Sequence, residues 1–109
     1  GLYDLHSSAD LDRIAATGAE LLTRDALGSI ASGTVNGIYY RGYRLQRIPK
    51  PLDQLGIPVD AVITHVNGMP ITDSKSLLDA IKLVLENRKP IMVEFVADRQ
   101  TKAIEYRVL

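Results

Sequence analysis

Apolar residues recur at helical spacing near the start of the chain, over residues 7–27. They are Leu11, Ile14, Ala15, Leu21 and Leu22, and their spacing predicts an amphipathic helix. Ser7 or Ser8 is suited to cap its first turn. Gly18 interrupts the pattern, so we expect a bend or break there. The short, mixed stretch before the helix is expected to be a loose end.

Glycine, serine and threonine then give way to β-branched and aromatic residues, which predicts strands. Asn36-Gly37 is the signal for a tight hairpin turn, because both positions tolerate positive φ. We expect a strand on each side of this turn. The second strand is predicted to run from Ile38 to Ile48, with a bend or bulge at Gly42. Pro49 ends it, and a single helical turn is expected at Leu52–Leu55.

The second half of the chain begins with the stretch GIPVDAVITHVNGMPITD, residues 56–73. Its apolar segment DAVITHV predicts a strand inside a sheet, and Asn67-Gly68 turns the chain into a brief return strand. Thr72 or Asp73 is expected to cap the amphipathic helix that follows. The alternating runs IMVEFVA and KAIEYRVL then predict a terminal hairpin joined by DRQT.

This order of elements predicts an α+β fold, in which a small curled antiparallel sheet or partial barrel is capped by two helices, with an extra N-terminal helix. We divide the chain into an N-terminal helical extension, residues 1–27, and a sheet domain, residues 28–109. A length of 109 residues with 46% hydrophobic residues suits one core.

Composition and charge narrow the range of functions. The 13 Lys and Arg residues balance 13 Asp and Glu residues, so no overall field attracts nucleic acid or an anionic membrane. No apolar run approaches the length that spans a bilayer, so we expect no membrane contact by this fragment. The chain contains no Cys, which excludes disulfides and thiolate chemistry. Because it begins with Gly1, we expect a longer parent protein, with room for anchors outside this segment.

Candidate chemistry is sparse. The histidines, His6 and His65, do not have the spacing of a metal site, and GSIASG is not a nucleophile motif. Helix capping accounts for Asp73 without catalysis. We therefore expect no enzyme activity, no metal and no cofactor. The segment YYRGYRLQR, residues 39–47, is of a type that stacks on nucleic acid, but the neutral net charge argues against that partner.

Residues 56–73, with the helix and hairpin that follow them, resemble a bacterial PDZ domain. The family pattern is roughly G-L-x-x-G-D-x-I-x-x-V-N-G, and the residues of this chain that fit it are Gly56, Ile57, Ile63, Val66, Asn67 and Gly68. The Gly-Asp pair of the pattern falls on Asp60 and Ala61 and does not match. Within the family, the segment GYRL at residues 42–45, placed after an N-terminal helix, is most similar to the C-terminal PDZ domain of the C component of bacterial type II secretion.

The resemblance implies a binding groove. PDZ domains take an extended C-terminus as an added strand between their second strand and second helix. On this chain the implied groove residues are Tyr43, Arg44, Leu45, Gln46, Arg47, Ser74, Lys75, Leu78 and Lys82. Gly56, Asn67 and Gly68 are expected to act only as structural turn residues. A peptide with a free C-terminus is predicted to perturb the backbone amides of residues 43–47.

The function implied by the resemblance is that of a non-catalytic module of a type II secretion inner-membrane component. It would engage exoproteins or partner components in the periplasm. The alternative is a regulatory peptide-binding PDZ domain of an envelope protease of the HtrA or site-2 type. A membrane helix precedes the domain in the first case, and a protease domain precedes it in the second.

Overall fold

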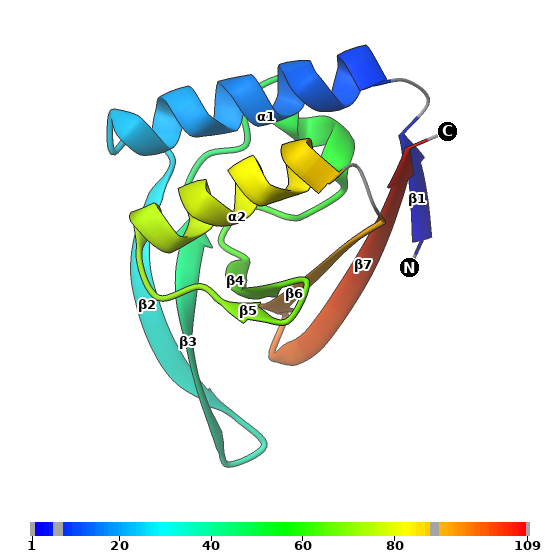
Figure 1. The fold of residues 1–109 in the computed structure, drawn as a ribbon. Coiled ribbons are helices and arrows are strands. Elements are labelled where there is room, and N and C mark those ends of the chain that lie inside the picture. Colours follow the sequence, from blue (N-terminus) through cyan, green and yellow to red (C-terminus); the bar gives the residue numbers. More distant parts are fainter. Residues whose placement is uncertain (1, 6–7, 88–89, 109) are drawn as a thin grey trace.

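The computed structural model describes residues 2–5, 8–87 and 90–108. Its elements, in chain order, are β1 (Leu2–Leu5), α1 (Ser8–Thr23), β2 (Gly28–Val35), β3 (Ile38–Leu45), the 3-10 turn η1 (Leu52–Leu55), β4 (Val62–Val66), β5 (Met69–Pro70), α2 (Ser74–Asn87), β6 (Ile91–Ala97) and β7 (Gln100–Val108). Both helices cover the same face of the sheet, and α1 runs alongside α2 (Figure 1). The predicted α+β fold is confirmed. Among the described residues, none of the helices has the length and apolar character needed to cross a membrane.

The strands form a 7-stranded sheet with the order β1-β7-β6-β4-β3-β2, and β5 pairs with β4 outside this path. All pairs are antiparallel except β1 with β7, which runs parallel from Leu2↔Glu105 to Leu5↔Val108. The expectation of a loose end is therefore wrong for Leu2–Leu5. The open edge of β7 offers unpaired backbone groups to this segment, and the segment satisfies them.

The core lies between the sheet and the helices. Leu11, Ile14 and Leu22 of α1 are buried in the same cluster as Phe95 of β6 and Tyr106 of β7. The helical extension therefore shares its core with the sheet domain, and a boundary between residues 27 and 28 stays a prediction.

Helix α1 runs without interruption through Gly18, so the predicted bend or break is wrong there. A Cβ at Gly18 would lie 3.6 Å from Leu52 Cδ2 and 3.8 Å from Ile81 Cδ1. The glycine thus stands where α1 packs on η1 and α2, and this tertiary packing offsets its weak helix propensity. The cap predicted at Ser7 or Ser8 lies outside the residues whose side chains are described.

The hairpin of β2 and β3 differs from prediction at its end. The N–H groups of Gln46 and Arg47 both donate to Leu27 O, at 3.0 Å and 3.3 Å, and the chain leaves the ladder there. The second strand therefore ends at Leu45 rather than Ile48. Pairing of β2 with β3 is regular past Gly42, so no bulge forms; the register shift lies instead between Ile63 and His65, where β4 meets β6.

The tight turns form at the positions predicted from the sequence. Asn36 and Gly37 have φ of 52° and 79°, and Asn67 and Gly68 have φ of 50° and 80°, the left-handed values of a tight hairpin turn. Gly56 has φ of 74° and ends η1 as a left-handed C-cap.

Asp73 caps α2, as predicted. Its Oδ1 accepts the Ser76 N–H at 2.7 Å, and Ser76 Oγ accepts the N–H of Asp73 at 3.1 Å in return. The hydrogen bond from the Ser76 backbone is the main cause that lowers the pKa of the Asp73 carboxyl. The ionised carboxylate is the better acceptor at the start of a helix.

Candidate functional site

The residues predicted to line the groove come from the end of β3 and from α2. Tyr43 and Leu45 are buried in the core. Arg44, Gln46 and Arg47 are exposed, and the Gln46 amide donates to Ser29 Oγ at 3.2 Å. On α2, Lys75 and Lys82 are exposed, Ser74 is half-buried, and Leu78 is half-buried against the core cluster.

Strand β3 has no free edge at these positions. Tyr43 pairs with Ile30 of β2 on one side and with Ile63 of β4 on the other, and Arg44 is likewise paired with both strands. Backbone groups that are paired on both sides cannot accept another strand. Strand addition on the backbone of Tyr43 and Arg44 is therefore excluded, and the edge on this side of the sheet is β2. Whether the side chains of residues 43–47 line a groove stays a prediction. Whether a peptide contacts the side chains named on α2 stays a prediction.

The two-residue turn determines which residues of β2 direct their backbone N–H and C=O groups away from β3. The flanking pair, Val35 and Ile38, exchanges both hydrogen bonds, and bonding then alternates along the two strands. The N–H and C=O groups that point away from β3 belong to Gly28, Ile30, Ser32 and Thr34.

The alternation is visible at the other end of β3. Leu45, seven positions along from Ile38, must direct its backbone groups away from β2. Its N–H donates to Ala61 O at 2.9 Å, and its C=O accepts the Asp60 N–H at 2.7 Å. Both partners lie on the β4 side, as the alternation requires.

Strand β2 lacks the features that usually protect a sheet edge. Its sequence, GSIASGTV, has no charged residue and no Pro, and its pairing with β3 has no register shift. Natural edge strands commonly carry at least one such feature against unwanted pairing. Ile30 is 40% exposed although Tyr43, its cross-strand partner on the same face, is buried. Free backbone groups beside an exposed apolar side chain are suited to bind an extended segment.

Our sequence reasoning missed these edge residues. The sequence feature that marks them is the absence of charged residues between Asp25 and Arg41. That feature predicted a strand, but it did not predict that the strand lies at the edge of the sheet. Its position at the edge depends on strand order, which no local pattern reveals.

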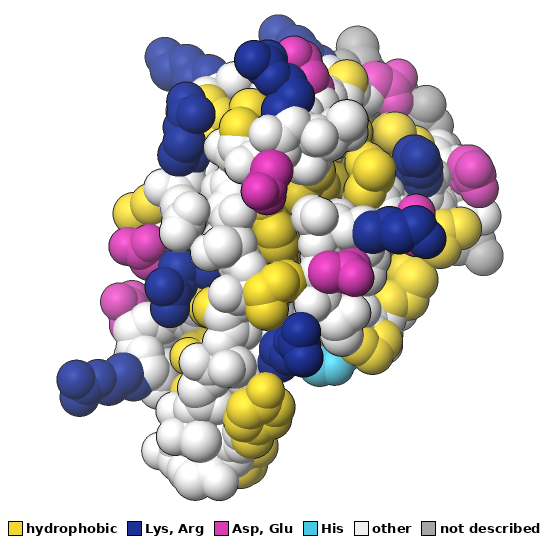
Figure 2. Space-filling view, turned by 90° about the vertical axis from the view of Figure 1, so that its left-hand side faces the viewer, with side chains coloured by type: hydrophobic (Ala, Val, Ile, Leu, Met, Phe, Trp, Pro, Cys, Tyr) yellow, Lys and Arg dark blue, Asp and Glu magenta, His cyan; other side chains and the backbone are white. Residues whose placement is uncertain are grey.

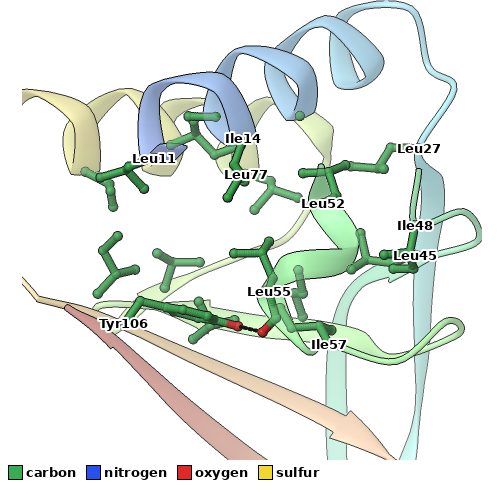
Figure 3. Close-up of a pocket in the computed structure, with 18 of the residues that line it drawn as sticks. Leu11, Ile14, Leu27, Leu45, Ile48, Leu52, Leu55, Ile57, Leu77 and Tyr106 are labelled. Atoms are coloured by element: carbon green, nitrogen blue, oxygen red, sulfur yellow. Dashed lines mark hydrogen bonds between the residues drawn. The ribbon is translucent and has the colours of Figure 1, made fainter. Parts of the chain in front are cut away.

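An apolar cavity of about 130 Å³ lies beneath α1 (Figure 3). Ile14 of α1, Ile81 of α2 and Leu52 of η1 line it, and Arg47 is the charged residue in the lining. The Tyr106 hydroxyl points across its floor and donates to Leu55 O at 2.5 Å. A cavity so poor in polar partners does not hold ordered water well. It lies inside the core cluster, so it belongs to the packing between α1 and the sheet.

The Tyr43 hydroxyl is a buried polar group beside the β2 edge. Its oxygen is enclosed and has no hydrogen-bond partner of ordinary geometry among the described residues. Burial is the main cause that raises the pKa of Tyr43 above its ordinary 10.0, while the Gly28 backbone opposes part of this rise.

Replacement of Tyr43 by phenylalanine is expected to raise the free energy of unfolding by about 1 kcal/mol, because it removes a polar group that is desolvated without a full partner. As pH rises above about 10, the unfolded chain loses its tyrosine proton before the folded one does, so stability falls. The variant should show less of this alkaline loss. Urea unfolding at pH 7 and at pH 10.5 measures both effects, and a loss of stability in Tyr43→Phe at pH 7 would contradict the first.

Candidate chemistry around His65 is limited. Its Nδ1 lies 3.1 Å from Thr64 Oγ1 and 3.4 Å from Glu94 Oε2, and Thr64 Oγ1 donates to Glu94 O at 3.2 Å. Within the described ranges, no group of three His, Cys, Asp or Glu side chains is placed to hold a metal ion. His6 lies outside those ranges. The absence of catalysis and of cofactors stays a prediction.

Comparison with known proteins finds similar solved structures. The chain is similar to the PDZ domain of EpsC from Vibrio cholerae. The alignment covers 91% of this chain and 98% of that domain, with 13% sequence identity and a TM-score of 0.47. No protein-family model and no curated protein matches the chain.

Proposed function

We propose that this chain is a protein-interaction module that binds an extended segment of a partner as an added strand along β2. The observation that carries the proposal is the uncharged, unbulged edge of β2, with backbone groups of Ile30 and Ser32 directed outward. Main-chain hydrogen bonds supply affinity in this mode, and side-chain pockets supply specificity. The exposed side chain of Ile30 gives the edge an apolar contact.

The finer proposal follows the sequence resemblance. The module would serve an inner-membrane component of type II secretion, with the domain in the periplasm and an exoprotein or another secretion component as partner. In the alternative, the same edge would sense peptides for an envelope protease. Reading the parent reading frame upstream of this segment separates them: a single membrane helix there supports the first, and a protease domain supports the second.

The strand-addition step is tested with a peptide of alternating valine and threonine that ends in a free carboxylate. We expect its titration to shift the amide resonances of Ile30, Ser32 and Thr34. Ser32→Pro removes an outward N–H without touching the β2–β3 ladder, so it should weaken binding about tenfold. Ser32→Thr keeps the N–H and is the matched control, which should bind as the unchanged protein does.

One outcome would overturn the proposal, and a second would overturn only the predicted recognition of a free C-terminus. If Ser32→Pro and Ser32→Thr bind equally well, the β2 edge is not the site. If an amide-capped peptide produces the same shifts and affinity, strand addition stands and recognition of the terminal carboxylate is wrong.

A further inference from the structure

The β2–β3 hairpin extends beyond the rest of the sheet. Within the described part of the chain, β3 pairs with β4 only at Tyr43 and Arg44. The outer half of the hairpin, residues 32–41, therefore projects as an arm, which is visible at the bottom of Figure 1. We refer to these residues as the arm.

The arm separates from β4 because β5 takes its place. The Ile71 N–H donates to Thr64 O at 2.9 Å, and His65 pairs with Pro70 of β5. The side of β4 that faced β3 at Ile63 is thus occupied by β5 farther along. The edge of β3 on that side is left without a neighbouring strand.

This edge of the arm offers its own backbone groups. The alternation that directs Leu45 toward β4 also directs Tyr39 and Arg41 away from β2. Their N–H and C=O groups face the space between the arm and β4. The hairpin therefore has unpaired groups on both sides: on the outer side of β2 and on the inner side of the arm.

A groove occupies that space. Its volume is about 390 Å³, and its walls include Tyr39, Tyr40 and Arg41 from the arm and Thr64, His65 and Glu94 from the sheet. In Figure 2 the arm projects at the bottom, and the histidine side chain lies next to a basic side chain where the arm meets the body. Tyr39 is 65% exposed, so its ring is available to cover an apolar side chain.

The two charged side chains that line the groove, Glu94 and Arg41, differ in whether another ionisable side chain lies beside them. Glu94 has His65 within 3.4 Å. Arg41 has no ion-pair partner among the described residues. Its charge acts on Asp73, whose pKa is lowered mainly by the hydrogen bonds of Ser76 and last by Arg41. The guanidinium is therefore the charge that an incoming carboxylate would pair with.

We propose that this groove binds an extended segment of a partner protein as an added strand on Tyr39 and Arg41, with an Asp or Glu side chain of the segment against Arg41. The unpaired strand edge selects an extended backbone, and the guanidinium selects the acidic side chain. This site is separate from the β2 edge, and it does not need a free C-terminus. A partner that occupied both sides of the hairpin would enclose the arm within a larger sheet.

The test uses a peptide blocked at both ends, in which a single glutamate lies among alternating valine and threonine, and its glutamine analogue. We expect the glutamate peptide to shift the amide resonances of Tyr39 and Arg41 and to bind about threefold tighter than the glutamine peptide, as a single exposed ion pair allows. Arg41→Gln should bind the two peptides equally. Tyr39→Pro removes the N–H that faces the groove and should weaken both about tenfold.

Ser32→Pro is the matched control, because it blocks the outer edge of β2 and leaves this groove intact. Shifts of the Tyr39 and Arg41 amides that saturate at the same concentration of the glutamate peptide in Ser32→Pro support the proposal, because these two amides report this groove alone, even if the β2 site fails its own test. The proposal is overturned by shifts confined to Ile30 and Ser32, by a preference for glutamate that survives in Arg41→Gln, or by no shift at all. Shifts at Tyr39 that follow protein concentration without peptide would also overturn it, since a second copy of the chain would then fill the groove.

Discussion

Replacement of Gly42 by alanine is expected to lower the free energy of unfolding by about 3 kcal/mol. A Cβ at this position would lie 2.0 Å from Ile63 O and 2.8 Å from Ile63 C. Both atoms belong to the backbone of β4, so no side-chain rotation relieves the overlap. β3 and β4 would have to separate in the interior of the sheet, at the point where Tyr43 pairs with Ile63.

Gly18→Ala is the matched control for this change. A methyl group there would make ordinary van der Waals contact with Leu52 and Ile81, and α1 would lose a poor helix former. We expect this variant to be about 0.5–1 kcal/mol more stable than the unchanged protein. Urea unfolding followed by far-ultraviolet circular dichroism measures both. If the two glycine variants were equally stable, the close approach of β3 and β4 at Gly42 would be wrong.

Truncation of Ile14 to alanine is the second change with a large expected effect, a loss of about 3 kcal/mol. Ile14 lies on α1, is 3% exposed and belongs to the core cluster. It also lines the cavity beneath α1, so the truncation enlarges an existing void rather than creating a new one. Lost apolar contact and a larger cavity both destabilise the fold.

A graded series separates packing from helix propensity. Ile14→Val removes one methylene group and should cost about 1 kcal/mol, while alanine is the better helix former of the three residues. A loss that grows from valine to alanine therefore reports packing. An unchanged urea midpoint for Ile14→Ala would instead mean that α1 is separable from the sheet, as the division at residues 27 and 28 predicts.

The hairpin of β2 and β3 carries both proposed binding sites, one on each of its edges. Ser32→Pro and Tyr39→Pro block opposite edges of the same hairpin, since residues 32 and 39 both direct their N–H groups out of the β2–β3 ladder. Each variant is therefore a control for the other. A partner that loses affinity with both would contact the hairpin from both sides.

Much of the fold was accessible from the sequence because its signals are local. Asn36-Gly37 and Asn67-Gly68 take positive φ at their own positions, whatever surrounds them. Asp73 caps α2 through a residue three positions away. The apolar periodicity of α1 and α2 follows from the geometry of one helix. Such features depend on a few residues that are neighbours in the sequence, so the sequence is enough to predict them.

Other features were decided only by the tertiary structure. Leu2–Leu5 forms a strand because β7 offers it an edge, and Gly18 stays helical because α1 packs on η1 and α2. The resemblance led to Tyr43 as a wall of the groove, but strand order places Tyr43 between two strands and leaves β2 at the edge. The sequence by itself determined most of the strands, helices and turns, but not the strand Leu2–Leu5. Which strand keeps unpaired backbone groups depends on long-range pairing, and that pairing decides where this protein can accept a partner.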